Sequence, residues 1–533
     1  MTIDNRIGAL WKRIPAPSRA AFFSCFLTGC LVHLYAFTNL IPNSDGLSRV
    51  YDTQQMTISG RWFLHYVSAL NGFTQMPMAI GLLAMLFLSL AAGFMAPLLG
   101  FESRVLAGAA GALLAAFPSL GYTFLYMFTA SDYCVAIFLA VLGVWLTAKW
   151  KFGWIAGACA LALSMGTYQA YASVAVTLSL LVVFRAFLEP EKQWKSTLWL
   201  GLRLVFHLAL GALLYYLILM VFLRVKDLEL LSYLGMDAAS SGYPIGRLPW
   251  MITSTYVQCV LFFFTPDCPG GFANHWMVLL DLALLVLAPL CLFLRLGFQK
   301  MYEQIWRIAG ALAMVLLLPV GMDFNQILSP YSEPTPMMRY AFVLVYMAAL
   351  MLIQMLDGPM QFRALPRRLP GVILAWTGLF LVFCLNTNNL IYTAAGQAHR
   401  ATESTATRLL ARIEACEGYE PGMEVAIIGP ASRAQGVSEI ESYQQVRHYS
   451  VPSGSVLSRN KHIYYYFQDW LNMPIAEPSE EVMQAVSDSP EFQAMPLYPA
   501  PGSVQVLDGR IVVRMAEEYT PKADYEIAYE NRR

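Results

Sequence analysis

Long apolar segments separated by very uneven polar loops constrain this chain of 533 residues more than any other feature. A bilayer core is about 30 Å thick, so a helix needs roughly 20 apolar residues to cross it. Segments 20–41, 78–99 and 198–223 reach that length. Charged residues make up only 13% of the chain, whereas a soluble domain has about 25%. The chain is therefore predicted to be an integral membrane protein.

The apolar pattern predicts an α-helical, polytopic membrane domain with about 11 transmembrane helices. The predicted helices are 20–41, 78–99, 105–127, 133–150, 154–167, 169–188, 198–223, 276–297, 305–322, 339–356 and 371–391. A polar break at 166–171 divides the fifth helix from the sixth. The formal net charge of zero gives no support for nucleic-acid binding.

Basic residues predict the orientation of these helices, because they concentrate in cytoplasmic loops. With a cytoplasmic N-terminus, the inner loops carry Arg104, Lys149, Lys151, Arg185, Lys192, Lys195, Arg295, Lys300, Arg363, Arg367 and Arg368. Basic residues are sparser in each outer loop. We therefore expect a transmembrane domain over 1–396, with outer loops at 42–77 and 224–275, and a C-terminal region outside the cytoplasm.

The C-terminal region 397–533 is predicted to be a small extracytoplasmic α/β domain. Helix signals occur at 402–415 and 479–494, and 424–429 is typical of a short buried strand. Asp508-Gly509 lies between two apolar runs and favours a hairpin turn.

The nine cysteines show no CxxC or Cys/His spacing, so no metal site is predicted from them. Cys259 and Cys268 share one outer loop, where they would form a disulfide or remain two unpaired thiols. No residue pattern indicates a cofactor, although the design is compatible with a divalent cation.

Acidic residues in the first outer loop are candidates for chemistry. Asp45 follows the first apolar segment directly, and a carboxylate at the membrane surface can act as a general base toward a hydroxyl. Alternatively, Asn43-Ser44-Asp45-Gly46 is typical of a turn that caps a helix. Asp52 is a second candidate and would bind acceptor hydroxyls, or lie on a solvated helix face.

Basic residues in the same loop suit a lipid phosphate. Arg49 and Arg61 lie there, and Arg61 and His65 have the i, i+4 spacing that puts two side chains on one helix face. A guanidinium binds phosphate oxygens bidentately. The alternative is an interfacial anchor, with Trp62 and Tyr66 in an aromatic belt.

Four further residues lie at predicted outer ends of helices. Asp132 is a further candidate catalytic carboxylate that would hold an acceptor or a metal, or it would simply complement a helix dipole. Tyr168 and Gln169 would line a sugar pocket, or only tie two short helices together. Arg339 would pair with a lipid phosphate, or with Glu333 or Asp323.

Several short motifs together resemble the bacterial glucosyl transferase II family, which includes the O-antigen serotype-converting glucosyltransferases. They are Asn43-Ser44-Asp45-Gly46, Ser59-Gly60-Arg61-Trp62, Ala130-Ser131-Asp132 and Thr167-Tyr168-Gln169-Ala170. This family is similar in design to the polyprenyl-phosphate-sugar transferases of the GT-C class. The resemblance covers roughly residues 30–190. It implies a multi-pass protein of the bacterial inner membrane, with Asp45 as the base of an inverting, periplasmic reaction.

We therefore expect a hexosyltransferase that moves a hexose, such as glucose, from undecaprenyl phosphate to a periplasmic glycan, such as lipopolysaccharide O-antigen. Its expected partners are the lipid-linked donor, a glycan or lipid-linked glycan acceptor, and the bilayer. A polysaccharide polymerase or ligase and a lipid-linked glycan transporter remain alternatives. Transport is less favoured because most predicted helix midplanes lack charged residues and no halves repeat.

Overall fold

The computed structural model describes residues 2–47, 51, 53–230, 244–266, 268, 271, 274–329, 335–356, 365–431, 446, 456–457 and 459–520. Their contacts divide the chain into two compact units. Unit 1 consists of Met1–Leu40, Tyr51–Leu390 and His448–Ser450. Unit 2 consists of Ile41–Val50, Ile391–Arg447 and Val451–Arg533. Each unit is described by itself below.

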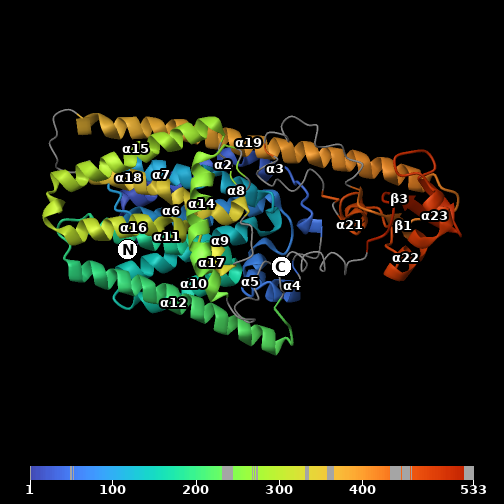
Figure 1. Cartoon of the computed structure of the whole chain (residues 1–533), viewed down its shortest axis with the longest axis horizontal. Helices are drawn as coiled ribbons and strands as arrows, with labels where there is room; N and C mark the ends of the chain where they lie inside the picture. The colour runs from blue at the N-terminus through green and yellow to red at the C-terminus, as the bar shows by residue number, and fades with distance from the viewer. Residues whose placement is uncertain are drawn as a thin grey trace. The chain divides into compact units, whose positions relative to one another are not determined.

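Unit 1 is built mainly from helices, most of which are apolar (Figure 1). They are α1 (Ile3–Arg13), α2 (Ala16–Val32), α3 (Leu34–Thr38), α6 (Pro77–Leu98), α7 (Arg104–Ala116), α8 (Pro118–Phe124), α9 (Met127–Lys149), α10 (Gly153–Thr167), α11 (Ala172–Phe187), α12 (Trp194–Val225), α15 (His275–Phe298), α16 (Ile305–Met322), α18 (Leu344–Leu356) and α19 (Leu365–Glu414). In the described part of the chain, eight helices are long and apolar enough to cross a membrane. The chain is a membrane protein, as predicted.

All eleven predicted segments are helical, but not all of them form full spans. α2 and α10 are shorter apolar helices, and α7 and α8 form a pair bent by 42° that would make a ninth span. Pro118 begins α8, and Phe117 before it has an extended ψ of 126°, because a proline disfavours helical backbone in the preceding residue. The count of about eleven spans, at roughly 20 residues each, stays a prediction.

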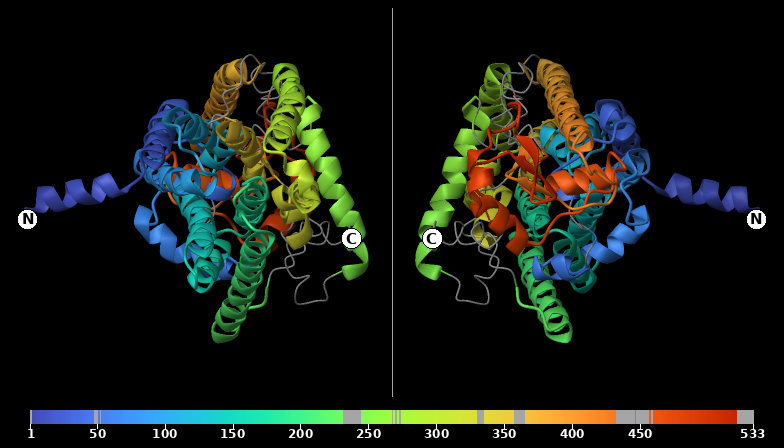
Figure 2. Two further views of the ribbon diagram at one scale, coloured as in Figure 1. Left: turned by 90° about the vertical axis from the view of Figure 1, so that its left-hand side faces the viewer. Right: turned by 90° about the vertical axis from the view of Figure 1, so that its right-hand side faces the viewer.

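Small residues allow the helices of unit 1 to approach closely. α2 packs against α6 and α7, and α9 packs between α6 and α10. A Cβ on Gly111 of α7 would lie 2.2 Å from the carbonyl oxygen of Ala21 on α2. Close backbone contact at such residues is a main source of helix association in lipid. α1, in contrast, projects away from the other helices (Figure 2).

The predicted outer loop 224–275 contains a helix that the sequence analysis missed. α14 (Leu248–Phe264) packs against α15 and α16 and runs across the long helices rather than alongside them (Figures 1 and 2). Cys259 lies in this helix, and Cys259 and Cys268 are both buried and are not bonded to each other. The disulfide alternative is therefore wrong for this structure.

Unit 2 contains a mixed three-stranded sheet in the order β1-β3-β2. β1 (Val425–Ile428) pairs parallel with β3 (Arg510–Arg514), and β2 (Val504–Leu507) pairs antiparallel with β3 across the predicted hairpin. Asp508 and Gly509 have φ values of 48° and 75°, as a tight two-residue turn requires. The small α/β fold is confirmed.

Both faces of this sheet are covered. The end of α19 and α21 (His462–Asp469) contribute to one core, and α22 (Glu480–Asp488) and α23 (Pro490–Ala494) contribute to the other. Alternate residues of β3 face the two cores, as the two-residue period of a strand requires. α19 is one continuous helix, although the sequence predicted two. It belongs to unit 1 up to Leu390 and to unit 2 from Ile391.

Candidate functional site

Residues 53–71 form short helices at one end of the unit 1 helices (Figure 1). α4 (Thr53–Ile58) and α5 (Leu64–Ser68) flank a turn in which Gly60 has a φ of 76°. The amide of Phe63 donates to the carbonyl of Gly166, at the end of α10, over 2.8 Å. Trp62 is 5% exposed and packs on Gly166. Trp62 is thus a buried packing residue, so its assignment to an aromatic belt is wrong.

Arg61 lies in this turn and contacts two tyrosines. Its Nη1 donates to the hydroxyl of Tyr133 over 3.4 Å, and its Cζ lies 5.0 Å from the ring centroid of Tyr168. The two tyrosine rings stack with their centroids 4.2 Å apart. Because cations are attracted to aromatic faces, this pair holds the guanidinium at the end of α10.

His65 does not share a helix face with Arg61, because α5 begins only at Leu64 and Arg61 lies in the turn before it. The i, i+4 premise is therefore wrong. The His65 imidazole stacks on Phe73 with centroids 4.8 Å apart. Its predicted substrate contact stays a prediction.

Asp132, in the first turns of α9, is fully buried and accepts two hydrogen bonds. The hydroxyls of Ser68 and Ser131 donate to its carboxylate over 2.6 and 3.0 Å. Ser68 belongs to α5, so this bond ties α5 to α9. Burial, and then the nearby charge of Asp132, raise the pKa of the Tyr51 hydroxyl. The predicted catalytic role of Asp132 remains a prediction, and its bonds suit a positioning role.

Gln169, in the short helix η3 (Gln169–Tyr171), holds the turn before Arg61 in place. Its Nε2 donates to the Ser59 carbonyl and to the Tyr215 hydroxyl, each over 3.0 Å. The Tyr215 hydroxyl in turn donates to the Gly60 carbonyl over 3.1 Å. These bonds agree with the alternative in which Gln169 ties elements together.

A second polar cluster lies beyond a row of tyrosines. Tyr168 and Tyr171 have ring centroids 5.3 Å apart, and Tyr171 and Tyr340 have centroids 6.4 Å apart. Tyr340 follows Arg339 in η6 (Pro336–Val343), which packs against η3. The Asn325 side chain of α17 (Asn325–Leu328) donates to the Met338 carbonyl over 2.8 Å and fixes this segment. Arg61 and Arg339 therefore lie at the same end of unit 1.

Arg339 is 2% exposed, and its Nη2 donates to Oε1 of Gln258 on α14 over 2.7 Å. Its Nε and Nη1 are buried and have no hydrogen-bond partner within the described residues. Asp323, directly after α16, is fully buried, and both of its carboxylate oxygens also lack a partner there. Burial raises the pKa of Asp323 to about 6, although the charge of Arg339 opposes the shift.

Arg339 and Asp323 are close enough to interact electrostatically, but they form no ion pair within 4.0 Å. The predicted alternative of an Arg339–Asp323 pair is therefore wrong, and Glu333 lies outside the described residues. The cluster leaves a buried cation and a buried anion with unused hydrogen-bonding capacity. Such groups are costly unless a ligand satisfies them.

The remaining predicted residues belong to the first outer loop. Asp45 begins η1 (Asp45–Leu47), which is part of unit 2, where Leu47 packs into the core. Asp45 is exposed, and its backbone amide donates to Oδ1 of Asn43 over 2.8 Å. Arg49 and Asp52 lie outside the described residues.

The comparison with known families identifies the family of this chain. A family model described as glucosyl transferase GtrII matches residues 34–356 of the chain. The chain belongs to this glucosyl transferase family. It is a glycosyltransferase, and the resemblance drawn from the short motifs is confirmed. No curated protein matches the chain.

The segment that matches the glucosyl transferase GtrII model contains both polar clusters and Asp45. Within the described residues, no three His, Cys, Asp or Glu side chains gather to hold a metal ion. Sequence reasoning missed Asp323 as a site residue and considered it only as a partner for Arg339. The available sequence signal for Asp323 was an acid directly after an apolar helix. Its lack of hydrogen-bond partners within the described residues depends on α14, α16 and η6 together.

Proposed function

We propose that this glucosyltransferase moves glucose from undecaprenyl phosphate to a hydroxyl of a periplasmic glycan, such as lipopolysaccharide O-antigen. The observation that carries the proposal is the pair of largely buried arginines, Arg61 and Arg339, at one end of the same unit. A guanidinium at that depth suits a phosphate whose lipid tail lies in the bilayer. Orientation with this end in the periplasm rests on the distribution of basic residues.

The proposed reaction is a single displacement at the anomeric carbon. A base removes the proton from the acceptor hydroxyl, whose oxygen bonds to the anomeric carbon as the bond to the phosphate oxygen breaks. The electron pair leaves with the polyprenyl phosphate. Because the phosphate gains negative charge in the transition state, an arginine beside it would accelerate the reaction. Asp45 is the proposed base, on the family resemblance and its place after the first apolar segment.

Asp323 would bind the sugar. Ionised carboxylates accept hydrogen bonds from sugar hydroxyls, and Asp323 has both oxygens available within the described residues. Tyr168 stacks on Tyr133 and lies under the Arg61 guanidinium, so its predicted place in the sugar pocket stays a prediction. Asp132 and Gln169 would hold the backbone around Arg61 in position.

An assay with two lipid donors tests the proposed function. Purified protein would be mixed with an O-antigen acceptor and either a short-chain polyprenyl-phosphate glucose or a polyprenyl-diphosphate oligosaccharide. We expect glucose transfer from the monophosphate and none from the diphosphate. Elongation from the diphosphate donor alone would instead make the protein a polymerase.

A further inference from the structure

A basic pocket lies at the opposite ends of the unit 1 helices and takes no part in the proposed reaction. It has a volume of about 90 Å³ and is lined where α6, α9 and α11 end and α12 begins. Its lining includes Lys149, Arg185, Glu189, Lys192, Ala148 and Leu200. Three of these are basic and one is acidic, so the pocket carries a net positive charge.

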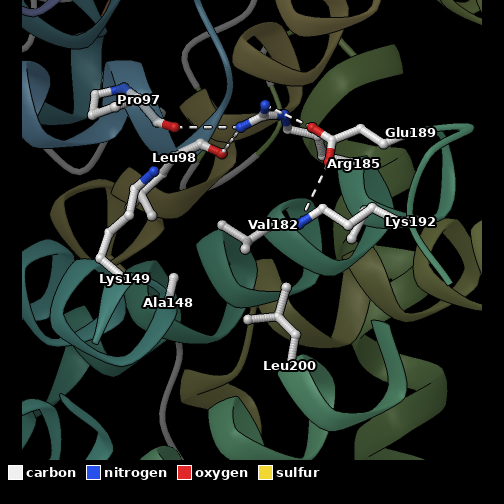
Figure 3. A pocket seen from close by; sticks show the side chains of 10 residues that line it. Pro97, Leu98, Ala148, Lys149, Val182, Arg185, Glu189, Lys192 and Leu200 are labelled. Carbon is white, nitrogen blue, oxygen red and sulfur yellow. Dashed lines mark hydrogen bonds and ion pairs between the residues drawn. The ribbon is translucent and has the colours of Figure 1, made fainter. Parts of the chain in front are cut away.

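The single acid is already engaged by two of the cations. Glu189 pairs with Arg185 over 2.6 Å and with Lys192 over 3.7 Å (Figure 3). Arg185 also donates to the carbonyls of Pro97 and Leu98. Lys149 lies within electrostatic reach of Arg185, Lys192 and Glu189, and its ammonium has no hydrogen-bond or ion-pair partner within the described residues. The pocket therefore has positive charge in excess of its internal pairing.

Two arginines of neighbouring helices hydrogen-bond the backbone that carries Glu189 and Lys192. Arg307 of α16 donates to the carbonyls of Phe187, Glu189, Pro190 and Lys192 over 2.5–3.2 Å. Arg295 of α15 donates to the Leu188 carbonyl over 3.1 Å. These bonds fix the turn, so the pocket is formed before a ligand arrives.

The pocket is lined by both charged and apolar side chains. In Figure 3, Arg185, Glu189 and Lys192 lie together, Lys149 lies on the other side of the pocket beside Ala148, and Leu200 lies away from the paired charges. Because α9 and α11 end here, the pocket lies where membrane-spanning helices leave the hydrocarbon. A phosphate among the cations, with an acyl chain along the apolar side chains, would match this distribution, and basic pockets between membrane helices bind anionic headgroups.

We propose that this pocket binds a phosphate anion, supplied by the headgroup of an anionic phospholipid. Lys149 and Lys192 are exposed and would contact the phosphate oxygens, while Arg185 and Glu189 shape the pocket. Each basic residue near such a headgroup contributes about fivefold in affinity, so loss of both lysines should weaken binding about 30-fold.

The test measures the shift in melting temperature of the full-length protein in detergent with phosphatidylglycerol, phosphatidylcholine or inorganic phosphate. We expect phosphatidylglycerol to stabilise the wild type and two control variants, K149R and K151Q. K149R keeps the positive charge in the pocket, and Lys151 lies outside the pocket. The K149Q/K192Q variant should need about 30-fold more lipid for the same shift. Stabilisation by inorganic phosphate that is lost in the same variant would keep the phosphate site and identify a soluble ligand.

Three results would overturn the proposal. One is the absence of a shift in both the phosphatidylglycerol and the inorganic phosphate arms. Another is an equal response to phosphatidylcholine, which would indicate a general lipid effect. The third is an unchanged lipid requirement in K149Q/K192Q. Glucosyl transfer, measured in parallel, is a separate readout, so this test and that of the proposed function fail independently.

Discussion

Asp132 and Asp323 are both fully buried in unit 1, but their surroundings differ in kind. Asp132 accepts hydrogen bonds from two serine hydroxyls that come from α5 and α9. Asp323 accepts none from the described residues and lies near Arg339, whose Nε and Nη1 are equally unsatisfied. One carboxylate completes the protein's own hydrogen bonding, whereas the other retains its capacity for a ligand.

This difference separates positioning from binding. A buried polar group without a partner costs about 1–3 kcal/mol, and more when it is charged. The protein bears that cost at Asp323, which is understandable if a substrate hydroxyl later satisfies the carboxylate. Each oxygen of Asp132 already accepts a hydrogen bond from the protein, so we infer that Asp132 acts by holding α5, and with it the turn that carries Arg61.

The assignment of Asp45 as the catalytic base sharpens this comparison, because it requires that neither Asp132 nor Asp323 is the base. We predict that Asp45→Asn lowers initial rates of glucose transfer by about 10²–10⁴-fold, since a positioned base is lost. Membrane insertion should be unchanged, because asparagine still suits the turn. Near-normal transfer by this variant would move the base to Asp52 or Asp132.

Arg61 and Arg339 offer a second way to test the comparison. Arg61→Lys and Arg339→Lys keep the charge but lose the planar fork that binds two phosphate oxygens. We expect kcat to fall roughly 10–10²-fold in each variant, with a smaller change in KM. Lys151→Gln is the matched control for loss of a surface charge. Full kcat in both lysine variants would remove the phosphate role.

Asp132 should reveal itself mainly through stability. Asp132→Ala leaves the hydroxyls of Ser68 and Ser131 without their acceptor and opens a cavity, so we expect a cost of about 1–3 kcal/mol. Asp132→Asn retains an acceptor oxygen and should lose less. Thermal unfolding in detergent measures both variants. An unchanged melting temperature with lost transfer would make Asp132 a direct catalytic group.

Asp323 should give a smaller and pH-dependent effect on stability. Its pKa is raised from 3.8 to about 6, so the folded protein binds this proton more tightly than the unfolded chain does. Ionisation then lowers stability as the pH rises from about 4 through 6. Asp323→Asn cannot ionise, so its gain in melting temperature over wild type should be larger at about pH 7.5 than at about pH 5. An equal gain at both pH values would contradict the raised pKa.

The sequence predicted what local patterns determine. The spans follow from the thickness of the bilayer, and the hairpin follows from Asp508-Gly509. α14 was missed because its apolar stretch lies in a segment assigned as a whole to an outer loop. The prediction that Arg61 and His65 share a helix face is wrong, because spacing alone does not show where a helix begins. The isolation of Asp323 depends on three elements that are distant in the sequence.

Rates of glucose transfer by Asp323→Asn at varied donor concentrations test most directly whether this end of unit 1 binds the sugar. With polyprenyl-phosphate glucose, we predict that kcat/KM falls roughly 10–10²-fold, since a hydrogen bond to a charged group is lost. The melting temperature at neutral pH should stay the same or rise. Wild-type transfer together with a higher melting temperature would show that Asp323 only costs stability, and would contradict the sugar-binding role.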